Sequence, residues 1–238
     1  MAKWFRTHHV ICVKFALTPS GQVAKTKLAM GKMLKFFYAP HTCSLATHIV
    51  LEEAGADYQS VRIDFASDQQ KSAAFTKINP KARVPALVTT EGTLTETPAM
   101  LVYVAQMHPE AALAPIKDPF CFAQVQAFNS FLCSTLHVAH AHRMRGYRWA
   151  DDEAAIASMQ RKAPQSVAAN FDLVEQHMLK GPWVMGDDYT ICDPYLFTIA
   201  QWMEADGVEP AQFPKVAGHR QRMAARPAVI ESIRQELA

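Results

Sequence analysis

One cysteine stands where the chain could use a thiol for chemistry. Cys43 lies between the apolar run LKFFYA (34–39) and the helix-like sequence SLATHIVLEEAG (44–55). Free backbone N–H groups and the positive end of a helix dipole favour thiolate over thiol, which predicts a pKa below the free value of about 8.5. Such a thiolate can exchange with disulfides or attack an electrophile. The alternative is a small buried hydrophobe, which is what most free cysteines are.

A second candidate is Val84-Pro85, which opens the apolar run VPALV. A proline at the first residue of a strand leaves the backbone of the preceding residue at an open sheet edge. An extended peptide can pair there by strand addition. A simple loop terminator is the alternative, and the sequence alone does not establish whether the X-Pro bond is cis.

A third candidate is Glu96-Thr97-Pro98, at the start of a predicted helix. Thr97 is a good N-cap and Pro98 suits the first helical position, so a purely structural interpretation is complete. The functional interpretation is that the helix start binds a carboxylate while Glu96 binds an ammonium. The head group of an amino acid carries both.

Other polar residues fit folding better than chemistry. Of His137, His140 and His142 only the first two share a helix face, and no carboxylate or HExxH spacing completes a metal site, so we predict no metal. Thr190 and Asp193 have capping-box spacing, and loss of such a cap costs about 0.5–2 kcal/mol. The tryptophans are interpreted as packing residues: Trp4, Trp149, Trp183 and Trp202.

The elements that must position these residues change character along the chain. Residues 34–112 predict the order β-α-β-α-β-β-α, with a hairpin turn at Glu91-Gly92 and a mixed sheet flanked by helices. The expected segments are a strand at 34–39, a helix at 44–55, a strand at 58–64, a polar helix at 68–77, two short strands within 83–96 and a helix ending before Pro109.

A proline-rich linker at 109–119 precedes a long helical region. Helical patterns cover 120–145, 152–179, 190–206, 213–225 and the residues after Arg226-Pro227. No strand-like alternation interrupts them, which predicts an all-α domain over residues 120–238.

Composition excludes several classes of protein. Half of the 238 residues are apolar, enough for a sizeable core, and a net charge of +2 is too small to indicate nucleic acid binding. No run approaches the roughly 18 apolar residues that a membrane span needs. Five cysteines without CxxC or regular spacing predict neither a disulfide framework nor a zinc ribbon, and a reducing cytoplasm fits this pattern.

Residues 1–33 differ from the rest because they carry six basic side chains and no acid. The remaining 18 of the 24 basic residues accompany all 22 acids, a net charge of −4. Lys14 interrupts the apolar stretch that a targeting signal needs. We therefore expect 1–33 to be an upstream extension, non-native or disordered, with Met30 or Met33 as the natural start.

Taken in order, the motifs resemble one family. YAPHTCSLATHIVLEEAG, NPKARVPAL, LTETPAMLVYVAQ, the LH pair at 136–137 and YTICDPYLF are similar to the bacterial beta-class glutathione transferases. The resemblance implies a thioredoxin-like α/β domain at 34–112, an all-α domain at 120–238 and glutathione as co-substrate. It also implies a homodimer with a role in detoxification.

The resemblance assigns roles residue by residue. Cys43 would contact the glutathione sulfur and could form a mixed disulfide, and Val84, before a cis Pro85, would pair with the tripeptide backbone. Glu96 would bind the γ-glutamyl ammonium, and Thr97 the γ-glutamyl carboxylate.

The resemblance also places His137 near the thiol, and it shows departures. The family usually has lysine where this chain has Val138, asparagine at Ser130 and glutamine at Arg83. Arg83 would add a cation for the glycyl carboxylate, or it is simply a solvated arginine.

Three functions, two of them catalytic, fit this sequence. The first is conjugation of glutathione to small apolar electrophiles, in a pocket built from residues scattered over 120–148, and the second is thiol-disulfide exchange through Cys43. The third is a non-catalytic ligand-binding or scaffold protein, motivated by Val138 and Ser130.

Overall fold

The computed structural model describes residues 34–238, so the predicted basic extension lies outside the described residues. Within these residues, four strands form one mixed sheet in the order β2-β1-β3-β4. They are β1 (Leu34–Tyr38), β2 (Tyr58–Arg62), β3 (Ala86–Val88) and β4 (Thr93–Thr95). β1 pairs parallel with β2 and antiparallel with β3, and β3 and β4 form the predicted hairpin.

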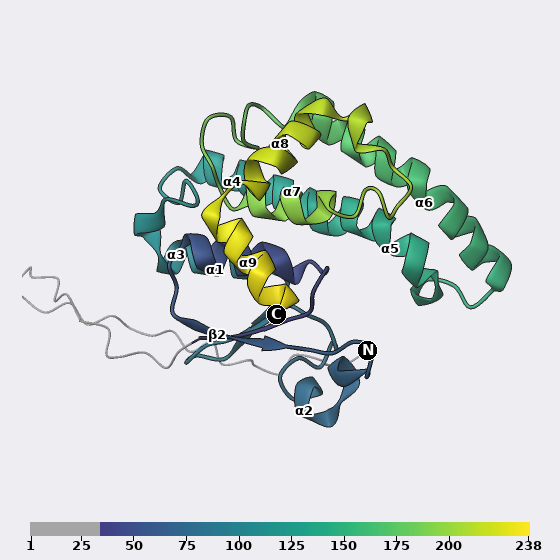
Figure 1. Cartoon of the computed structure of the whole chain (residues 1–238), viewed down its shortest axis with the longest axis horizontal. Helices are drawn as coiled ribbons and strands as arrows, with labels where there is room; N and C mark the ends of the chain where they lie inside the picture. Colours follow the sequence, from purple (N-terminus) through teal and green to yellow (C-terminus); the bar gives the residue numbers. More distant parts are fainter. Residues whose placement is uncertain (1–33) are drawn as a thin grey trace, which may run out of the picture. The chain divides into compact units, whose positions relative to one another are not determined.

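Both faces of the sheet are covered because β1 alternates between two cores. Phe36 and Tyr38 belong to the large core shared with the helices, whereas Phe37 packs on the opposite face against Phe75 of α2. Figure 1 shows this arrangement, with α1 and α3 on one side of the sheet and α2 on the other. The register sets Phe36 opposite Leu87, and both are fully buried.

The thioredoxin-like half carries three helices and two 3₁₀ turns. They are α1 (Ser44–Glu53), η1 (Gln69–Lys71), α2 (Ala73–Thr76), α3 (Thr97–Met107) and η2 (Pro109–Ala111). The single helix predicted over 68–77 is wrong, because Ser72 is extended and breaks it. The Ser72 hydroxyl accepts a hydrogen bond from the Phe75 N–H, which makes Ser72 an N-cap rather than a helix interior residue.

The rest of the chain is helical, as predicted. Its elements are α4 (Pro119–Phe131), η3 (Leu132–Leu136), α5 (His137–Arg145), η4 (Gly146–Arg148), α6 (Glu153–Leu173), η5 (Val174–Met178), α7 (Cys192–Ala200), η6 (Pro210–Gln212), α8 (Pro214–Ala224) and α9 (Pro227–Leu237). Two of these, η3 and η5, are π-helical turns that continue α4 and α6 without a break. α7 ends at Ala200, earlier than the predicted 206, and turns follow it.

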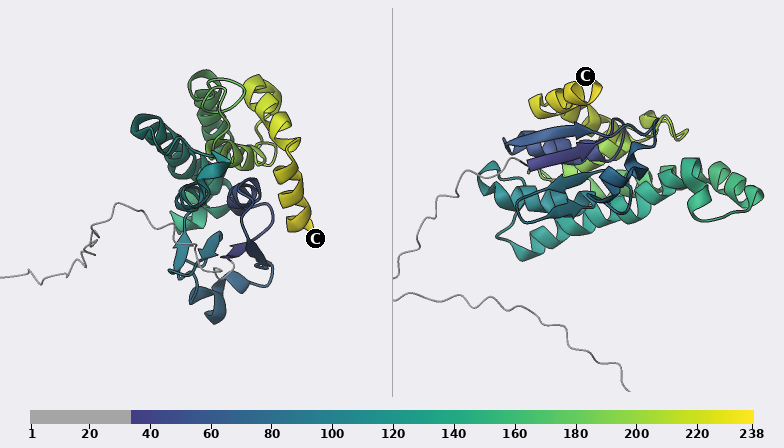
Figure 2. Two further views of the ribbon diagram at one scale, coloured as in Figure 1. Left: turned by 90° about the vertical axis from the view of Figure 1, so that its left-hand side faces the viewer. Right: turned by 90° about the horizontal axis from the view of Figure 1, so that it is seen from below.

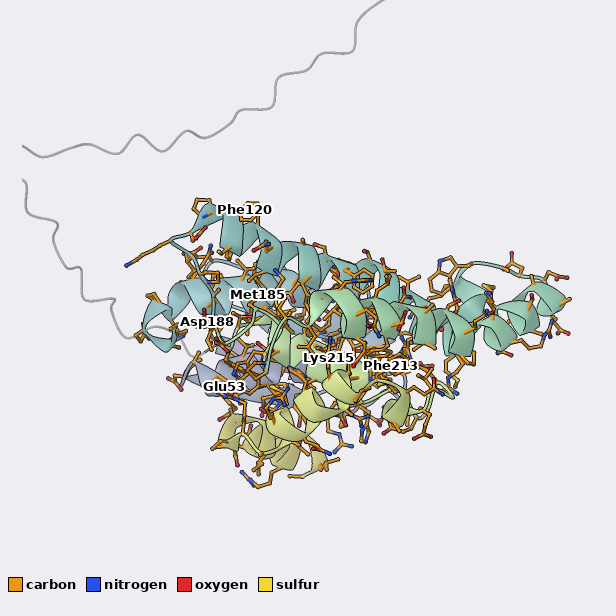
Figure 3. The ribbon with its side chains drawn as sticks, turned by 90° about the horizontal axis from the view of Figure 1, so that it is seen from above. Glu53, Phe120, Met185, Asp188, Phe213 and Lys215 are labelled. Carbon is orange, nitrogen blue, oxygen red and sulfur yellow. The ribbon has the colours of Figure 1, made fainter. Side chains whose placement is uncertain are left out.

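Helix α1 joins the two halves. It contacts α3, α7 and α9, and the left view of Figure 2 shows α9 beside it. Glu53, labelled in Figure 3, accepts hydrogen bonds from Arg226 (2.6 and 2.9 Å) and from the hydroxyl of Tyr189 (3.1 Å). His48 in the middle of α1 contacts Glu236 of α9 at 3.1 Å. Cys43, just before α1, is therefore held by a helix with little freedom to shift.

The proline-rich segment 109–119 is packed rather than a loose linker. Leu113 is buried in the shared core, and its carbonyl accepts a hydrogen bond from the Ile191 N–H at 2.9 Å.

Among residues 34–238, no helix is both long and apolar enough to span a membrane.

Candidate active site

A cleft of about 500 Å³ lies where the start of α1, the segment before β3, the start of α3 and the helix α5 meet. All seven residues selected from the sequence line it. They are Cys43, Arg83, Val84, Pro85, Glu96, Thr97 and His137. Segments up to 94 residues apart in the chain therefore converge on one space.

Cys43 occupies the N-cap position of α1, as its sequence context predicts. Its thiol is partly buried and lies 3.8 Å from the carbonyl oxygen of Val84, to which it can donate. Burial raises the pKa of Cys43, and this outweighs the lowering by a hydrogen bond with Thr97 and by the charge of Arg145. The predicted low pKa is thus wrong, because the loss of water around a thiolate exceeds the stabilisation by the helix terminus.

Val84 and Pro85 are joined by a cis peptide bond, as the resemblance implied. Strand β3 begins at Ala86, one residue later than predicted, and Ala86 pairs with Phe37 at the end of the sheet. Within the described residues, the N–H of Val84 has no hydrogen-bond partner. Val84 therefore lines the cleft beside Cys43 with an unpaired N–H and a carbonyl within reach of the Cys43 thiol.

The start of α3 differs by one residue from the prediction. Glu96, not Thr97, is the N-cap. Its backbone φ is +75°, a value that residues other than glycine rarely adopt. Such a conformation costs about 1–3 kcal/mol and is concentrated at functional sites. The Glu96 carboxylate is ion-paired with Lys81, which also donates to the Thr95 hydroxyl at 2.6 Å. Thr97 is buried in the first turn.

His137, the first residue of α5, lines the cleft together with His140 and Trp202, and these three residues are called the histidine wall. Burial lowers its pKa to about 3, and the nearby charges of His140 and Arg145 act in the same direction. The imidazole is therefore neutral near pH 7 and can donate or accept a hydrogen bond, but it supplies no cation. Its ring centre lies 5.0 Å from that of Trp202.

An ion-pair network fixes this wall. His140 stacks on Trp202 with ring centres 4.3 Å apart, and its Nδ1 lies 2.7 Å from the buried carboxylate of Asp206. Asp206 also accepts from Nε of Arg143 at 2.9 Å. The indole of Trp202 donates to the carbonyl of His41 at 3.2 Å, which ties the wall to the loop that carries Cys43.

The departures from the family pattern lie in different places. Val138 lines the cleft, whereas Ser130 lies on α4, is exposed and is not among the lining residues.

Within residues 34–238, no three histidine, cysteine, aspartate or glutamate side chains converge as metal ligands would.

Several lining residues were missed by sequence reasoning. They are Cys133, His140, Arg145, Arg148, Trp149, Tyr195 and Trp202. Trp149, interpreted as a packing residue, does pack against His142 with ring centres 4.5 Å apart, but it is also 48% exposed and lines the cleft. Arg145 could have been found, because on a helix it shares a face with His137 eight residues earlier.

The fold and the cleft define a thioredoxin-like domain with a helical domain completing its site. The model of the glutathione S-transferase N-terminal domain matches residues 32–106, and that of the C-terminal domain matches residues 136–227. The glutathione S-transferase GstA of Escherichia coli O157:H7 is 32% identical over 206 residues, which cover 85% of this chain and 98% of GstA.

Solved structures of glutathione transferases share this fold. A glutathione transferase homologue from Sulfitobacter with bound glutathione is 43% identical, with a TM-score of 0.84 over 87% of this chain and 99% of that chain. The beta-class glutathione S-transferase of Sphingomonas chungbukensis is 31% identical, with a TM-score of 0.74 over 85% and 98%. The chain belongs to the glutathione S-transferase family, which confirms the predicted fold class and enzyme class.

Proposed function

We propose that this protein conjugates glutathione to small electrophilic molecules. The observation that carries the proposal is the convergence of an open backbone edge at Val84, a carboxylate at Glu96, a helix start at Thr97 and a thiol at Cys43 on one cleft. Glutathione is a peptide with an ammonium, two carboxylates and a thiol, so each of its groups has a chemically matched partner.

In the proposed pose, the tripeptide lies extended along the edge at Val84 and pairs with its backbone. The γ-glutamyl ammonium displaces Lys81 from Glu96, and the γ-glutamyl carboxylate lies at the start of α3 by Thr97. Arg83, exposed at the cleft, receives the glycyl carboxylate.

The sulfur of glutathione then lies near Cys43 and His137. A protonated Cys43 is an S–H donor, and the raised pKa keeps it protonated at neutral pH. Such a donor, placed in advance, stabilises the thiolate of glutathione as it forms. The thiolate attacks the electrophilic carbon, a C–S bond forms, the leaving group departs with the bonding pair and the thiol proton passes to solvent.

The test uses Glu96→Gln, which keeps the shape of the side chain but removes the charge that binds the ammonium. We expect the KM for glutathione to rise about tenfold or more, because a charge-assisted hydrogen bond becomes a neutral one. The matched control is Glu91→Gln, in the exposed β3-β4 turn. Conjugation of 1-chloro-2,4-dinitrobenzene is the assay. An unchanged KM in Glu96→Gln would contradict the proposed pose.

Thiol-disulfide exchange is a second proposed activity of the same site, favoured by the position of Cys43 in the cleft. Cys43→Ala should abolish reduction of a glutathione mixed disulfide, which needs a bond to the Cys43 sulfur, and should only slow conjugation, which loses an S–H donor. If conjugation is unchanged, Cys43 is a redox thiol and takes no part in conjugation. If the wild type binds glutathione tightly but turns over neither substrate, only the ligand-binding or scaffold function is left.

We further propose a cytoplasmic homodimer with a detoxifying role, in line with the family. Sedimentation at micromolar protein tests the assembly, and a monomer there would reject the dimer.

A further inference from the structure

The cleft carries more positive charge than glutathione can use. Arg83, Arg145 and Arg148 all line it, and among its described lining residues Glu96 is the one acid. Glu96 is itself paired with Lys81. The sequence predicted small apolar electrophiles, so these arginines need an explanation.

None of the three arginines forms an ion pair with a residue of the described chain, 34–238. Residues 1–33 contain no aspartate or glutamate and so offer no side-chain carboxylate. Arg145 is partly buried, and its pKa is lowered first by burial and then by the charge of Arg148, with a smaller effect of Arg83. Cations held together without anions form an environment that a bound anion would stabilise.

The proposed glutathione pose leaves two of these cations unassigned. The ammonium and both carboxylates of glutathione already have partners, and Arg83 is one of them. Arg145 is the last residue of α5, and Arg148 is the last residue of η4. Figure 1 shows α5 and α6 running side by side to the right-hand end, where residues 146–152 join them.

Aromatic side chains alternate with these cations in the sequence Arg145-Gly146-Tyr147-Arg148-Trp149. Tyr147 is 63% exposed and Trp149 is 48% exposed, yet both line the cleft. Exposed aromatic side chains and arginines that line one cleft match a ligand with a flat apolar ring and an attached anionic group.

We propose that Arg145 and Arg148, with Tyr147 and Trp149, bind the anionic end of an aromatic electrophile, so that the protein selects negatively charged aromatic substrates over neutral ones. This inference rests on the proposed function and names the substrate class of the same site. The conjugation itself is unchanged: with an aryl chloride, the C–S bond forms, the C–Cl bond breaks and chloride leaves.

The test compares a charged probe with a neutral one of the same shape. Binding of 3-nitrobenzoate and of 3-nitrobenzamide to the glutathione-loaded protein is measured by titration calorimetry at low salt. We expect the benzoate to bind about tenfold more tightly, and 0.5 M NaCl to reduce this preference because salt screens exposed charges. Conjugation of 4-chloro-3-nitrobenzoate and 4-chloro-3-nitrobenzamide, each divided by its uncatalysed rate, should show the same order.

Variants assign the preference to residues. Arg145→Met and Arg148→Met should each reduce the benzoate-to-benzamide ratio about three- to tenfold. Arg161→Met, on the exposed face of α6 and outside the cleft, should leave that ratio unchanged. Arg148 is exposed, so its replacement gives a readout even if Arg145→Met does not fold.

Two results would overturn the inference. One is equal affinity of the wild type for the two probes. The other is a pair of arginine variants that weaken glutathione binding and leave the probe ratio unchanged, since the arginines would then serve glutathione. Failure of the proposed function gives a different result, namely preferential binding of the benzoate with no conjugation of either aryl chloride.

Discussion

Replacing Asp193 with alanine should destabilise this protein more than the loss of an ordinary helix cap. Asp193 is fully buried near the start of α7. One of its oxygens accepts from the N–H of Val184 at 2.8 Å and contacts Nε2 of His219 at 3.0 Å. Its other oxygen accepts from the N–H of Thr190 at 2.7 Å. The predicted capping box is therefore part of a larger hydrogen-bond network.

The magnitude follows from the groups that the substitution leaves unpaired. Val184 is 1% exposed, Thr190 is 3% exposed and His219 is fully buried, so water does not readily replace the carboxylate. Each buried donor left without a partner costs about 1–3 kcal/mol. Allowing for local relaxation, we expect Asp193→Ala to lower the free energy of unfolding by about 3–6 kcal/mol, a large share of the 5–15 kcal/mol typical of a folded protein.

Urea unfolding followed by circular dichroism, at one fixed protein concentration, measures this loss. Asp193→Asn keeps one oxygen acceptor and should lose less than Asp193→Ala. Asp188→Ala, at an exposed position nearby, is the matched control and should stay within about 0.5 kcal/mol of the wild type. A loss below about 1 kcal/mol for Asp193→Ala would refute the argument, because the buried donors would then have found other partners.

Two further predictions concern the charges of the cleft. Because burial raises the pKa of Cys43, its alkylation by iodoacetamide, followed by mass spectrometry, should keep accelerating above pH 9; a rate that levels off below pH 8 would contradict this. His137 has a folded pKa of about 3 against 6.5 for the free group, so protonation favours the unfolded chain. The stabilisation that comes from keeping His137 neutral is complete above pH 6.5. It is lost as the pH falls towards 3, and the free energy of unfolding then decreases by at most about 1.4 kcal/mol per pH unit. Urea unfolding at pH 7 and pH 5 should therefore show a loss of about 1–2 kcal/mol that His137→Gln reduces and the exposed control His177→Gln does not. Equal losses in the wild type and His137→Gln would reject a buried neutral imidazole.

Local sequence signals predicted the elements that carry the site because their causes are local. The alternation in β1, the period of α1 and the turn at Glu91-Gly92 depend on residues close in the chain, and the structure has each of them. The helix over 68–77 was predicted wrongly because the Ser72 hydroxyl accepts a hydrogen bond from the backbone N–H of Phe75. Such side-chain hydrogen bonds compete with helical ones, and the polar composition of the segment does not reveal which of the two forms.

Properties that depend on distant contacts were not predictable. The helix terminus at Cys43 was visible in the sequence, but the burial that raises its pKa comes from segments far along the chain. Helical spacing could place Arg145 on the face of His137, but the lack of a counter-anion for Arg145 and Arg148 among residues 34–238 depends on packing that no spacing reveals. Asp193 was recognised as a cap, but its bond to His219, 26 residues later, requires the packed helices.

The uncharged groups and the cations of the cleft have complementary roles under the proposed function. Burial keeps Cys43 protonated and His137 neutral, so neither offers a charge of its own near pH 7. Arg83, Arg145 and Arg148 meanwhile supply a positive potential in the same space. A negative charge in the cleft is then most stable on a bound molecule: on the sulfur of glutathione beside the Cys43 thiol, and on the electrophile beside the arginines. A protein thiolate at Cys43 would compete for that potential, so its raised pKa favours activation of the substrate thiol over activation of the protein's own.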